Sequence, residues 1–297
     1  MRERRLLDRL QAGERLVGDG GWGTMLMARG LEAGRPPESL LLTRPEAIEE
    51  VTELYLAAGA QIITTNTFGG CPLSLRMHDL EDETEEISRL AVETVRRVAG
   101  DAAYVSASVG PSGRLLEPYG DVPRDEMQAA FQRQIRGLLE GEPDAICVET
   151  MTDLAEASLA VAAAKSLSPS TPVMATMTFD DTHRGFFTVM GVSLQQAANG
   201  LKEAGADVIG SNCGNGSDTM VEIARALAPH TSLPILIQPN AGIPENRDGL
   251  VVYPESPQYM AERATELIDV GVAIVGGCCG TTPDHIRALR EVVVARA

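Results

Sequence analysis

The sequence predicts an α/β protein whose 297 residues form a single TIM barrel, the closed (β/α)8 architecture. Eight short runs rich in valine and isoleucine recur along the chain, which is the pattern of buried parallel strands. A segment with helical periodicity separates each run from the next, as in "RPEAIEEVTELYLAAG" and "ESPQYMAERATELIDVG". Eight strand and helix units at a spacing of about 30 to 40 residues match the usual size of this barrel. A doubly wound open sheet is the competing architecture, and it explains eight strands in one series less well.

The predicted strands follow one another without an intervening linker, so residues 1–297 are expected to form one domain. Each strand is a short apolar run that closes on polar or glycine residues. The first four are "RLVGDG" (15–20), "AQIITTN" (60–66), "AYVSASVG" (103–110) and "DAICVET" (144–150). The last four are "PVMATMTF" (172–179), "ADVIGSNC" (206–213), "LPILIQPN" (233–240) and "VAIVGGCC" (272–279).

Composition restricts the partners and the location of the protein. Hydrophobic residues make up 44% of the chain but aromatic residues only 4%, so aliphatic side chains must supply the core packing. A formal net charge of −17 argues against binding to nucleic acids or to anionic membranes. The charged start "MRERRLLDRLQAGERL" has no apolar signal region, and no run approaches the roughly 18 apolar residues of a membrane span. We therefore expect a cytoplasmic protein with neither a nucleic-acid nor a membrane partner.

Polar or reactive residues stand at the ends of the predicted strands. In a TIM barrel the carboxyl ends of all strands meet at one face, where the βα loops build the active site. Residues far apart in the sequence are therefore expected to converge there. The residues at these ends are Asp19, Asn66, Glu149, Thr178, Cys213, Asn240, Cys278 and Cys279.

Three cysteines at two of these strand ends predict a metal site. Cys213 closes the sixth predicted strand, and Cys278 and Cys279 close the eighth. Each cysteine taken alone has another interpretation as a small buried apolar residue, and adjacent cysteines also allow a vicinal disulfide, which a reducing compartment disfavours. Three thiolates suit a tetrahedral Zn²⁺ ion whose fourth position stays open for water or substrate. The pattern therefore predicts a Zn²⁺ site of the catalytic kind.

The remaining cysteines and the last histidine are expected to be structural. Cys147 lies inside the fourth predicted strand, where a small apolar group would pack a layer of the barrel, and Cys71 precedes a proline in the second loop. His285 falls in the first turn of the last predicted helix, behind Thr282 and Pro283, and is expected at the surface.

Seven short motifs resemble those of one known family. They are "GDGGWGT", "TNTFGG", "GPSG", "CVETM", "GSNCG", "QPNAG" and "GGCCGTTPDH". In order and position they resemble the zinc-dependent homocysteine S-methyltransferases, and most closely the homocysteine-binding barrel of cobalamin-dependent methionine synthase. The resemblance extends from about residue 14 to about residue 292. It implies that Cys213, Cys278 and Cys279 hold Zn²⁺ and activate the thiol of homocysteine.

The resemblance also implies residues that bind the amino-acid part of homocysteine. Asp19 and Glu149 would receive its ammonium group, although Asp19 could instead cap a turn and Glu149 could instead pair with an arginine. The backbone N–H groups of Gly23 and Thr24 would receive its carboxylate. The predicted substrate contacts include two further strand-end residues, Asn66 and Asn240. For Asn240, an approach to the metal in the absence of substrate and a role in a turn are equally open.

The methyl donor is predicted from what the sequence lacks. A quaternary ammonium such as betaine usually needs an aromatic cage. Thr150 follows Glu149 and Gly69 follows Phe68 where the betaine-using enzymes carry tyrosines. Methylcobalamin on a separate corrinoid protein is therefore the expected donor. The alternatives are a free-standing enzyme that uses S-methylmethionine or betaine, and a non-catalytic subunit that binds zinc and a thiol.

Overall fold

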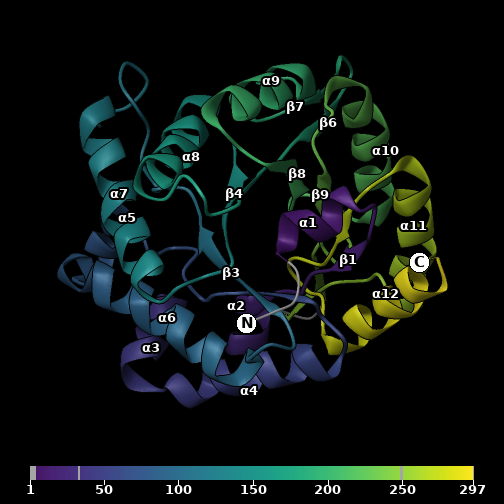
Figure 1. Cartoon of the computed structure of the whole chain (residues 1–297), viewed down its shortest axis with the longest axis horizontal. Helices are drawn as coiled ribbons and strands as arrows, with labels where there is room; N and C mark the ends of the chain where they lie inside the picture. The colour runs from purple at the N-terminus through teal and green to yellow at the C-terminus, as the bar shows by residue number, and fades with distance from the viewer. Residues whose placement is uncertain (1–4, 33, 248–249, 297) are drawn as a thin grey trace.

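The main sheet closes on itself to form a barrel. The computed structural model describes residues 5–32, 34–247 and 250–296. Eight strands pair in parallel in the order β1-β12-β9-β8-β5-β4-β3-β2. A parallel bridge between Gly18 and Ile62 joins the end of β1 to β2 and so connects the first and last members of this order. Figure 1 shows the helices as an outer ring around the strands. The predicted TIM barrel is confirmed.

Every predicted run contains one strand of the barrel. The barrel strands are β1 (Leu16–Val17), β2 (Ile62–Thr64), β3 (Tyr104–Val109), β4 (Ala145–Met151), β5 (Val173–Met177), β8 (Val208–Asn212), β9 (Ile235–Gln238) and β12 (Ile274–Val275). Two antiparallel hairpins follow β5 and β9, and the sequence analysis predicted neither of them. They are formed by β6 (Asp180–Thr182) with β7 (Gly185–Phe187), and by β10 (Glu245–Arg247) with β11 (Leu250–Val252).

One long helix follows each barrel strand, as the alternation of patterns predicts. These helices are α4 (Pro45–Ala57), α6 (Thr84–Ala99), α7 (Arg124–Glu140), α8 (Leu154–Leu167), α9 (Leu194–Ala204), α10 (Ser217–Leu227), α11 (Pro257–Val270) and α12 (Pro283–Ala295). Several begin where the sequence supplies a cap: the Asp153 side chain accepts a hydrogen bond at the start of α8, and Ser193 forms a capping box at the start of α9. The shorter elements are α1 (Leu6–Gln11), α2 (Trp22–Met27), α3 (Leu40–Thr43), α5 (Pro72–Leu75), η1 (Pro37–Ser39), η2 (Arg76–His78), η3 (Glu81–Glu83) and η4 (Ala228–His230).

A small cluster of buried side chains fills the amino-terminal end of the barrel. Leu6 and Leu10 of α1 pack against it, so this short helix closes the base, and Figure 1 shows α1 in the middle of the ring. Cys147 belongs to the same cluster, which confirms its predicted packing role. The barrel residues of the cluster are Leu16, Ile62, Tyr104, Ala145, Cys147, Met174, Val208, Leu236 and Ile274.

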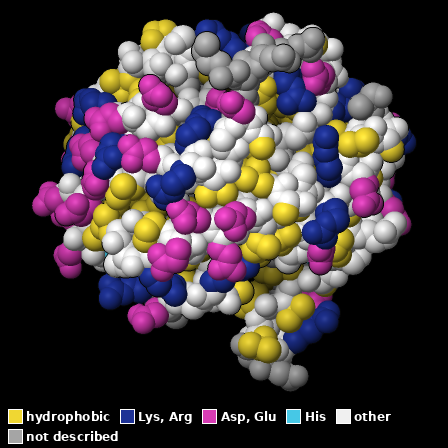
Figure 2. All heavy atoms as spheres, turned by 60° about the horizontal axis from the view of Figure 1, so that its bottom comes forward, with side chains coloured by type: hydrophobic (Ala, Val, Ile, Leu, Met, Phe, Trp, Pro, Cys, Tyr) yellow, Lys and Arg dark blue, Asp and Glu magenta, His cyan; other side chains and the backbone are white. Residues whose placement is uncertain are grey.

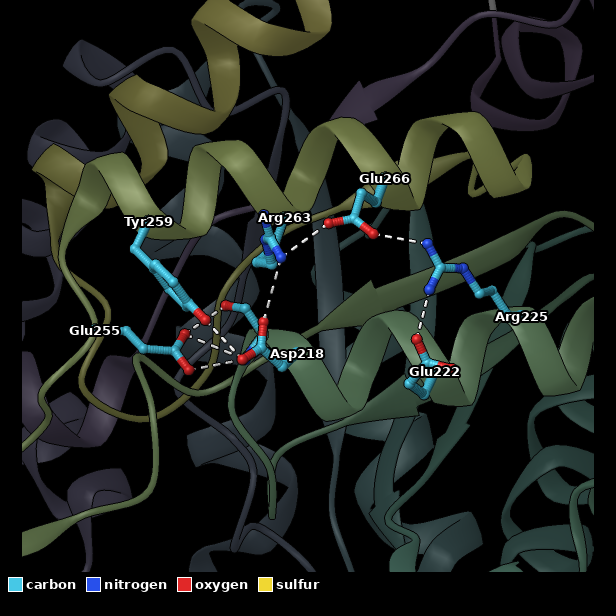
Figure 3. A network of polar contacts seen from close by, with 8 residues as sticks. Asp218, Glu222, Arg225, Glu255, Tyr259, Arg263 and Glu266 are labelled. Atoms are coloured by element: carbon cyan, nitrogen blue, oxygen red, sulfur yellow. Dashed lines mark hydrogen bonds and ion pairs between the residues drawn. The ribbon is translucent and has the colours of Figure 1, made fainter.

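A polar network holds α10 to α11 on the outside of the barrel (Figure 3). Arg225 of α10 pairs with Glu222 on its own helix at 2.5 Å and with Glu266 of α11 at 2.6 Å. Glu255 lies just before α11 and accepts hydrogen bonds from the backbone nitrogen (3.1 Å) and hydroxyl (2.5 Å) of Ser217 at the start of α10. Exposed ion pairs add little stability, but a carboxylate at a helix start satisfies free N–H groups. The network therefore fixes the loops that lead into both helices.

His285 is buried, so its predicted place at the surface is wrong. Its side chain is 6% exposed, although it stands in the first turn of α12 as expected. Nδ1 lies 2.9 Å from the Thr282 hydroxyl, and Nε2 lies 3.0 Å from the carbonyl oxygen of Glu255. The imidazole turns inward because it completes a capping box and at the same time binds the segment that precedes α11.

The outer surface carries charges of both signs. In Figure 2 acidic and basic side chains stand close to one another over much of the face shown. Among the described residues no helix combines the length and the apolar character that a membrane crossing requires.

Candidate active site

The three predicted cysteines converge at the carboxyl end of the barrel. Their Sγ atoms all lie within 4.8 Å of one another, and those of Cys213 and Cys279 are 3.9 Å apart. The last residue of β9 and the residue that follows it hold both loops in place. The backbone nitrogen of Cys213 donates to the carbonyl of Gln238 at 3.1 Å, and that of Cys278 donates to the carbonyl of Pro239 at 2.8 Å. The convergence predicted from strand positions is therefore present.

The spacing of the sulfurs fits a tetrahedral metal ion. With Zn–S bonds of about 2.3 Å, two sulfurs of a tetrahedral Zn²⁺ site lie roughly 3.8 Å apart. Without a metal, hydrogen bonds from the thiols of Cys213 and Cys278 lower the pKa of Cys279. The hydrogen bonds that Cys278 itself makes with Cys213, the larger cause, and with Cys279 raise the pKa of Cys278 well above its usual value. The cluster therefore favours a state in which Cys279 is a thiolate that accepts hydrogen bonds from the other two thiols. A soft cation bound to the three sulfurs would displace the protons of those two thiols.

The backbone is strained beside this cluster. Cys213 has φ of 59° and Thr150, at the end of β4, has φ of 61°. A non-glycine residue in this left-handed region costs on the order of 1–3 kcal/mol and persists where its surroundings hold it. The left-handed turn at Cys213 comes directly after β8. Strain of this kind is typical of functional sites, where the backbone holds a side chain in one orientation.

Asp19 is buried at the end of β1 and is held by three donors. It is 1% exposed, and its carboxylate accepts hydrogen bonds from the Thr64 nitrogen (2.7 Å), the Thr64 hydroxyl (2.9 Å) and Trp22 Nε1 (2.8 Å). Burial raises the pKa of Asp19 to about 6, and the hydrogen bonds oppose that rise. The hydrogen bonds therefore fix the orientation of the Asp19 carboxylate but offset only part of the energetic cost of burying its charge.

Glu149 occupies the corresponding position on β4. Its carboxylate accepts hydrogen bonds from the Ser108 hydroxyl and, at 3.4 Å, from Asn212 Nδ2. The pKa of Glu149 is raised to about 7, chiefly by burial; the hydrogen bond from Ser108 opposes this rise, and the nearby acidic groups of Asp19 and Cys213 contribute to it. Throughout the described ranges no arginine or lysine forms an ion pair with Glu149, so the alternative interpretation of an arginine pair does not hold. Both carboxylates lack a cation, and a substrate ammonium would supply one.

One cavity of about 770 Å³ brings most of the predicted residues together. Gly23 and Thr24 lie in the first turn of α2, where backbone N–H groups have no partner within the helix. Asn66 reaches the cavity wall, but its amide donates to the carbonyl of Pro37 at 2.8 Å. The predicted residues that line the cavity are Asp19, Gly23, Thr24, Asn66, Glu149, Cys213, Cys278 and Cys279.

Asn240 stands apart from this group. It is 4% exposed and is absent from the described lining of the cavity. Its backbone nitrogen donates to the carbonyl of Asn215 at 2.9 Å, while its side-chain oxygen is buried with no hydrogen-bond partner among the described residues. Its predicted contact with the substrate site stays a prediction.

Sequence reasoning missed two residues of the site. Asn212, the last residue of β8, contacts Glu149, Thr150 and Cys278. Its position in a buried strand directly before Cys213 was a usable signal, because a buried amide must find partners. Tyr253 follows β11, and its hydroxyl hydrogen-bonds to the thiol of Cys279. No local pattern could reveal Tyr253, because its place depends on the hairpin that precedes it.

Most large apolar side chains at the surface lie in the βα connections, and of these Phe68 lines the cavity. Eleven of the twelve large hydrophobic side chains found exposed in the described residues lie in connections that run from a barrel strand to the next long helix. The exception is Val294 near the end of α12. An exposed apolar rim is typical of a surface that meets a ligand or a partner. The eleven are Met27, Leu42, Phe68, Met77, Leu115, Tyr119, Val189, Met190, Ile243, Leu250 and Val251.

The fold and the site together define a TIM barrel with a centre of three thiols and two carboxylates at the carboxyl end of its strands. The family model for homocysteine S-methyltransferase matches residues 16–293. The chain therefore belongs to the homocysteine S-methyltransferase family.

Relatives and solved structures agree with this membership. The chain is 35% identical to the methionine synthases of Mycobacterium leprae (strain TN) and Mycobacterium tuberculosis (strain ATCC 25618 / H37Rv), over 94% of its own length. It spans about a quarter of the length of these relatives, 24% in each case. The crystal structure of the homocysteine methyltransferase MmuM from Escherichia coli in its metallated form has a TM-score of 0.80 and 25% identity, and covers 98% of this chain and 99% of its own.

Proposed function

We propose that this protein transfers a methyl group to the sulfur of homocysteine and so produces methionine. One observation carries the proposal: three convergent thiols share one cavity with two carboxylates that form no ion pair with any described residue. A thiol and an ammonium on the same small molecule would satisfy both sets of groups. Family membership supports the same substrate.

The residues of the chain divide the work of binding. Zn²⁺ held by Cys213, Cys278 and Cys279 would convert the substrate thiol to a thiolate at neutral pH. Asp19 and Glu149 bind the ammonium group, while the N–H groups at the start of α2 receive the carboxylate. In the reaction a bond forms between sulfur and the methyl carbon, and the bond from that carbon to the donor breaks. Its electron pair stays on the donor, and the thiol proton leaves to solvent.

Methylcobalamin on a separate corrinoid protein is the donor that we propose. The exposed apolar rim formed by the βα connections suits a large partner. Trp22 and Phe68 are the aromatic side chains, apart from His78, in the described lining of the cavity. Trp22 is already hydrogen-bonded to Asp19, so it is poorly placed to help enclose a trimethylammonium group.

A free-standing enzyme with a small donor is the second candidate. The observation that favours it is the structural similarity to the homocysteine methyltransferase MmuM, with a TM-score of 0.80 and 25% identity. S-methylmethionine and betaine are the donors to test. The third candidate is a non-catalytic subunit that stores zinc or a thiol. The two carboxylates beside the thiols argue against it, because storage does not require them.

The first prediction concerns the metal. We expect about one Zn²⁺ per chain, and loss of most of it in each of the variants Cys213→Ser, Cys278→Ser and Cys279→Ser, because an alcohol is a poor ligand for this ion. Metal analysis after dialysis is the measurement, with Cys147→Ser as the control outside the cluster. Full zinc retention in all three variants would contradict the prediction.

The second prediction concerns the donor. With homocysteine and a methylated corrinoid protein, the zinc-loaded chain should form methionine, and betaine should support no turnover. Free methylcobalamin is expected to react more slowly, because a carrier protein orients the methyl group. Methionine is assayed for each donor in parallel. Turnover with S-methylmethionine or betaine and none with either corrinoid would select the free-standing enzyme, and no methionine from any donor would reject the methyltransferase.

A further inference from the structure

Asn212 connects the two halves of the candidate site. It is fully buried at the end of β8, and its carboxamide contacts residues of β4, β5 and the loop after β12. The residues assigned above to metal and substrate do not include it. The inference below rests on the proposed function, because it assigns the two ends of the substrate to the thiols and to Glu149.

The orientation of this carboxamide follows from its partners. The backbone N–H of Thr150 lies 2.8 Å from one side-chain atom of Asn212, and an N–H can only donate. That atom is therefore the oxygen Oδ1, which also accepts the hydroxyl of Thr176 at 2.6 Å. The nitrogen Nδ2 consequently faces the other way, toward the site.

The nitrogen has more acceptors than hydrogens. Nδ2 lies 2.8 Å from the Thr150 hydroxyl oxygen, 3.4 Å from Glu149 Oε2 and 3.9 Å from Cys278 Sγ. An amide nitrogen carries two hydrogens, and the short bond to Thr150 takes one of them. The other is shared between the carboxylate of Glu149 and the sulfur of Cys278. Because Nδ2 contacts both atoms, the distance between Glu149 Oε2 and Cys278 Sγ cannot exceed the sum of the two contact distances.

We propose that Asn212 is a positioning residue that ties the sulfur centre to the ammonium-binding carboxylate through this shared N–H group. The tie sets the distance between the place of the substrate sulfur and the place of its ammonium. The site therefore favours an amino thiol of one length, homocysteine, over cysteine, which has one methylene fewer. Hydrogen bonds of this kind also steady the ligand that they contact, and their removal weakens metal binding or activity by about 10- to 100-fold.

Two variants test the tie, and a third serves as the matched control. Asn212→Asp keeps an oxygen for Thr150 N–H and Thr176, which protects the fold, but at pH 8 it offers no N–H to Cys278 or Glu149. In Asn212→Ser the side chain is too short to contact either Glu149 or Cys278. Thr176→Val deletes a bond on the oxygen side of the same carboxamide and leaves both Nδ2 contacts in place. Each protein is loaded with Co²⁺, whose sulfur-to-metal charge-transfer band reports the electron density on the thiolates.

In both Asn212 variants we expect the band to move to longer wavelength, because a sulfur without its hydrogen bond gives up charge more easily. We also expect homocysteine affinity to fall about 10-fold or more and the preference over cysteine to narrow. Thr176→Val should keep the band of the original protein and its affinity within threefold. An unchanged band in Asn212→Asp, with homocysteine affinity no lower than in Thr176→Val, would overturn the proposal. The band is read without donor or turnover, so it decides the role of Asn212 even if the original protein makes no methionine.

Discussion

Asp19 is fully buried and Glu149 is partly exposed, and the two carboxylates also differ in bonding. Asp19 uses both oxygens to accept three hydrogen bonds from Thr64 and Trp22, whereas Glu149 is held by Ser108 and by a long contact from Asn212. Burial raises the pKa of both, to about 6 and about 7. Asp19 therefore has a structural role in joining β1 to β2 as well as a role in binding, while Glu149 remains free to respond to a bound cation.

This difference leads to the third prediction. Glu149→Gln should weaken homocysteine binding by about 1.5–3 kcal/mol, the usual value of a hydrogen bond to a charged group, and leave zinc in place. Asp19→Asn should weaken binding too, and it should also lower the free energy of unfolding by about 1–3 kcal/mol, because an amide oxygen cannot accept from all three donors. Calorimetric titration and denaturant unfolding measure the two effects.

Glu156 offers a matched control for Glu149. It is 5% exposed and accepts two hydrogen bonds from Ser112, at 2.8 Å from its nitrogen and 2.6 Å from its hydroxyl, yet it does not line the described cavity. Glu156→Gln should leave homocysteine affinity unchanged. Equal affinities in the original protein and in both cavity variants would assign Asp19 and Glu149 to structure alone.

At the scale of elements, α12 depends on a histidine that must stay neutral. His285 joins the start of α12 to the carbonyl of Glu255, and Glu255 in turn holds the start of α10. Burial lowers the pKa of His285, and its contacts with Glu255 and Asp284 oppose this. The starts of α10, α11 and α12 are thus connected through the imidazole of His285, so its protonation would disturb the contacts of all three helices.

The fourth prediction concerns this histidine and pH. Because its pKa is lower in the folded state than in the unfolded chain, the unfolded chain binds the proton more readily. The stabilising contribution of His285 is complete above about pH 6.5 and is lost as the pH falls through and below that value. Unfolding free energies from pH 8 to pH 5 should therefore show the difference between the original protein and His285→Gln shrinking toward acid. A difference between the original protein and His285→Gln that stays constant from pH 8 to pH 5 would refute the prediction.

The sequence predicted the barrel strands because β-branched runs and helical periods are local properties. The hairpins β6–β7 and β10–β11 escaped prediction, since their strands are three residues long and largely exposed and carry no apolar alternation. The cysteine cluster was predictable because barrel topology alone brings strand ends together. Asn212 offered only a partial signal, its position in a buried strand next to Cys213, and Tyr253 offered none, because the roles of both depend on which atoms face them across strands and loops.

At the scale of the whole molecule, the barrel is closed at one end and open at the other. Leu6 and Leu10 of α1 are 2% and 6% exposed and pack on the cluster inside the base, while the cavity opens among the βα loops. Stability and function are therefore located at opposite ends, as is usual for this fold.

The fifth prediction tests this separation. Leu6→Ala and Leu10→Ala should each lower the free energy of unfolding by about 2–5 kcal/mol, because a buried leucine leaves a cavity behind. Zinc content and homocysteine affinity of the folded protein should not change. Denaturant unfolding and metal analysis provide the readouts, and Val294→Ala, at a side chain that is 55% exposed, is the control. A Leu10→Ala protein that folds fully but loses zinc would show that the two ends are coupled.

The closed base also dictates the order of events in a catalytic cycle. With α1 across one end, the homocysteine, methionine and methyl donor of the proposed reaction would share the entrance at the other end. A bulky donor seated on the apolar rim would block the path of a small thiol to the sulfur centre. Homocysteine must therefore enter first, and methionine can leave only after the spent donor has withdrawn. Steady-state kinetics should follow an ordered mechanism in which homocysteine binds first. An excess of donor should inhibit the reaction, because donor bound to the free enzyme blocks the entry of homocysteine.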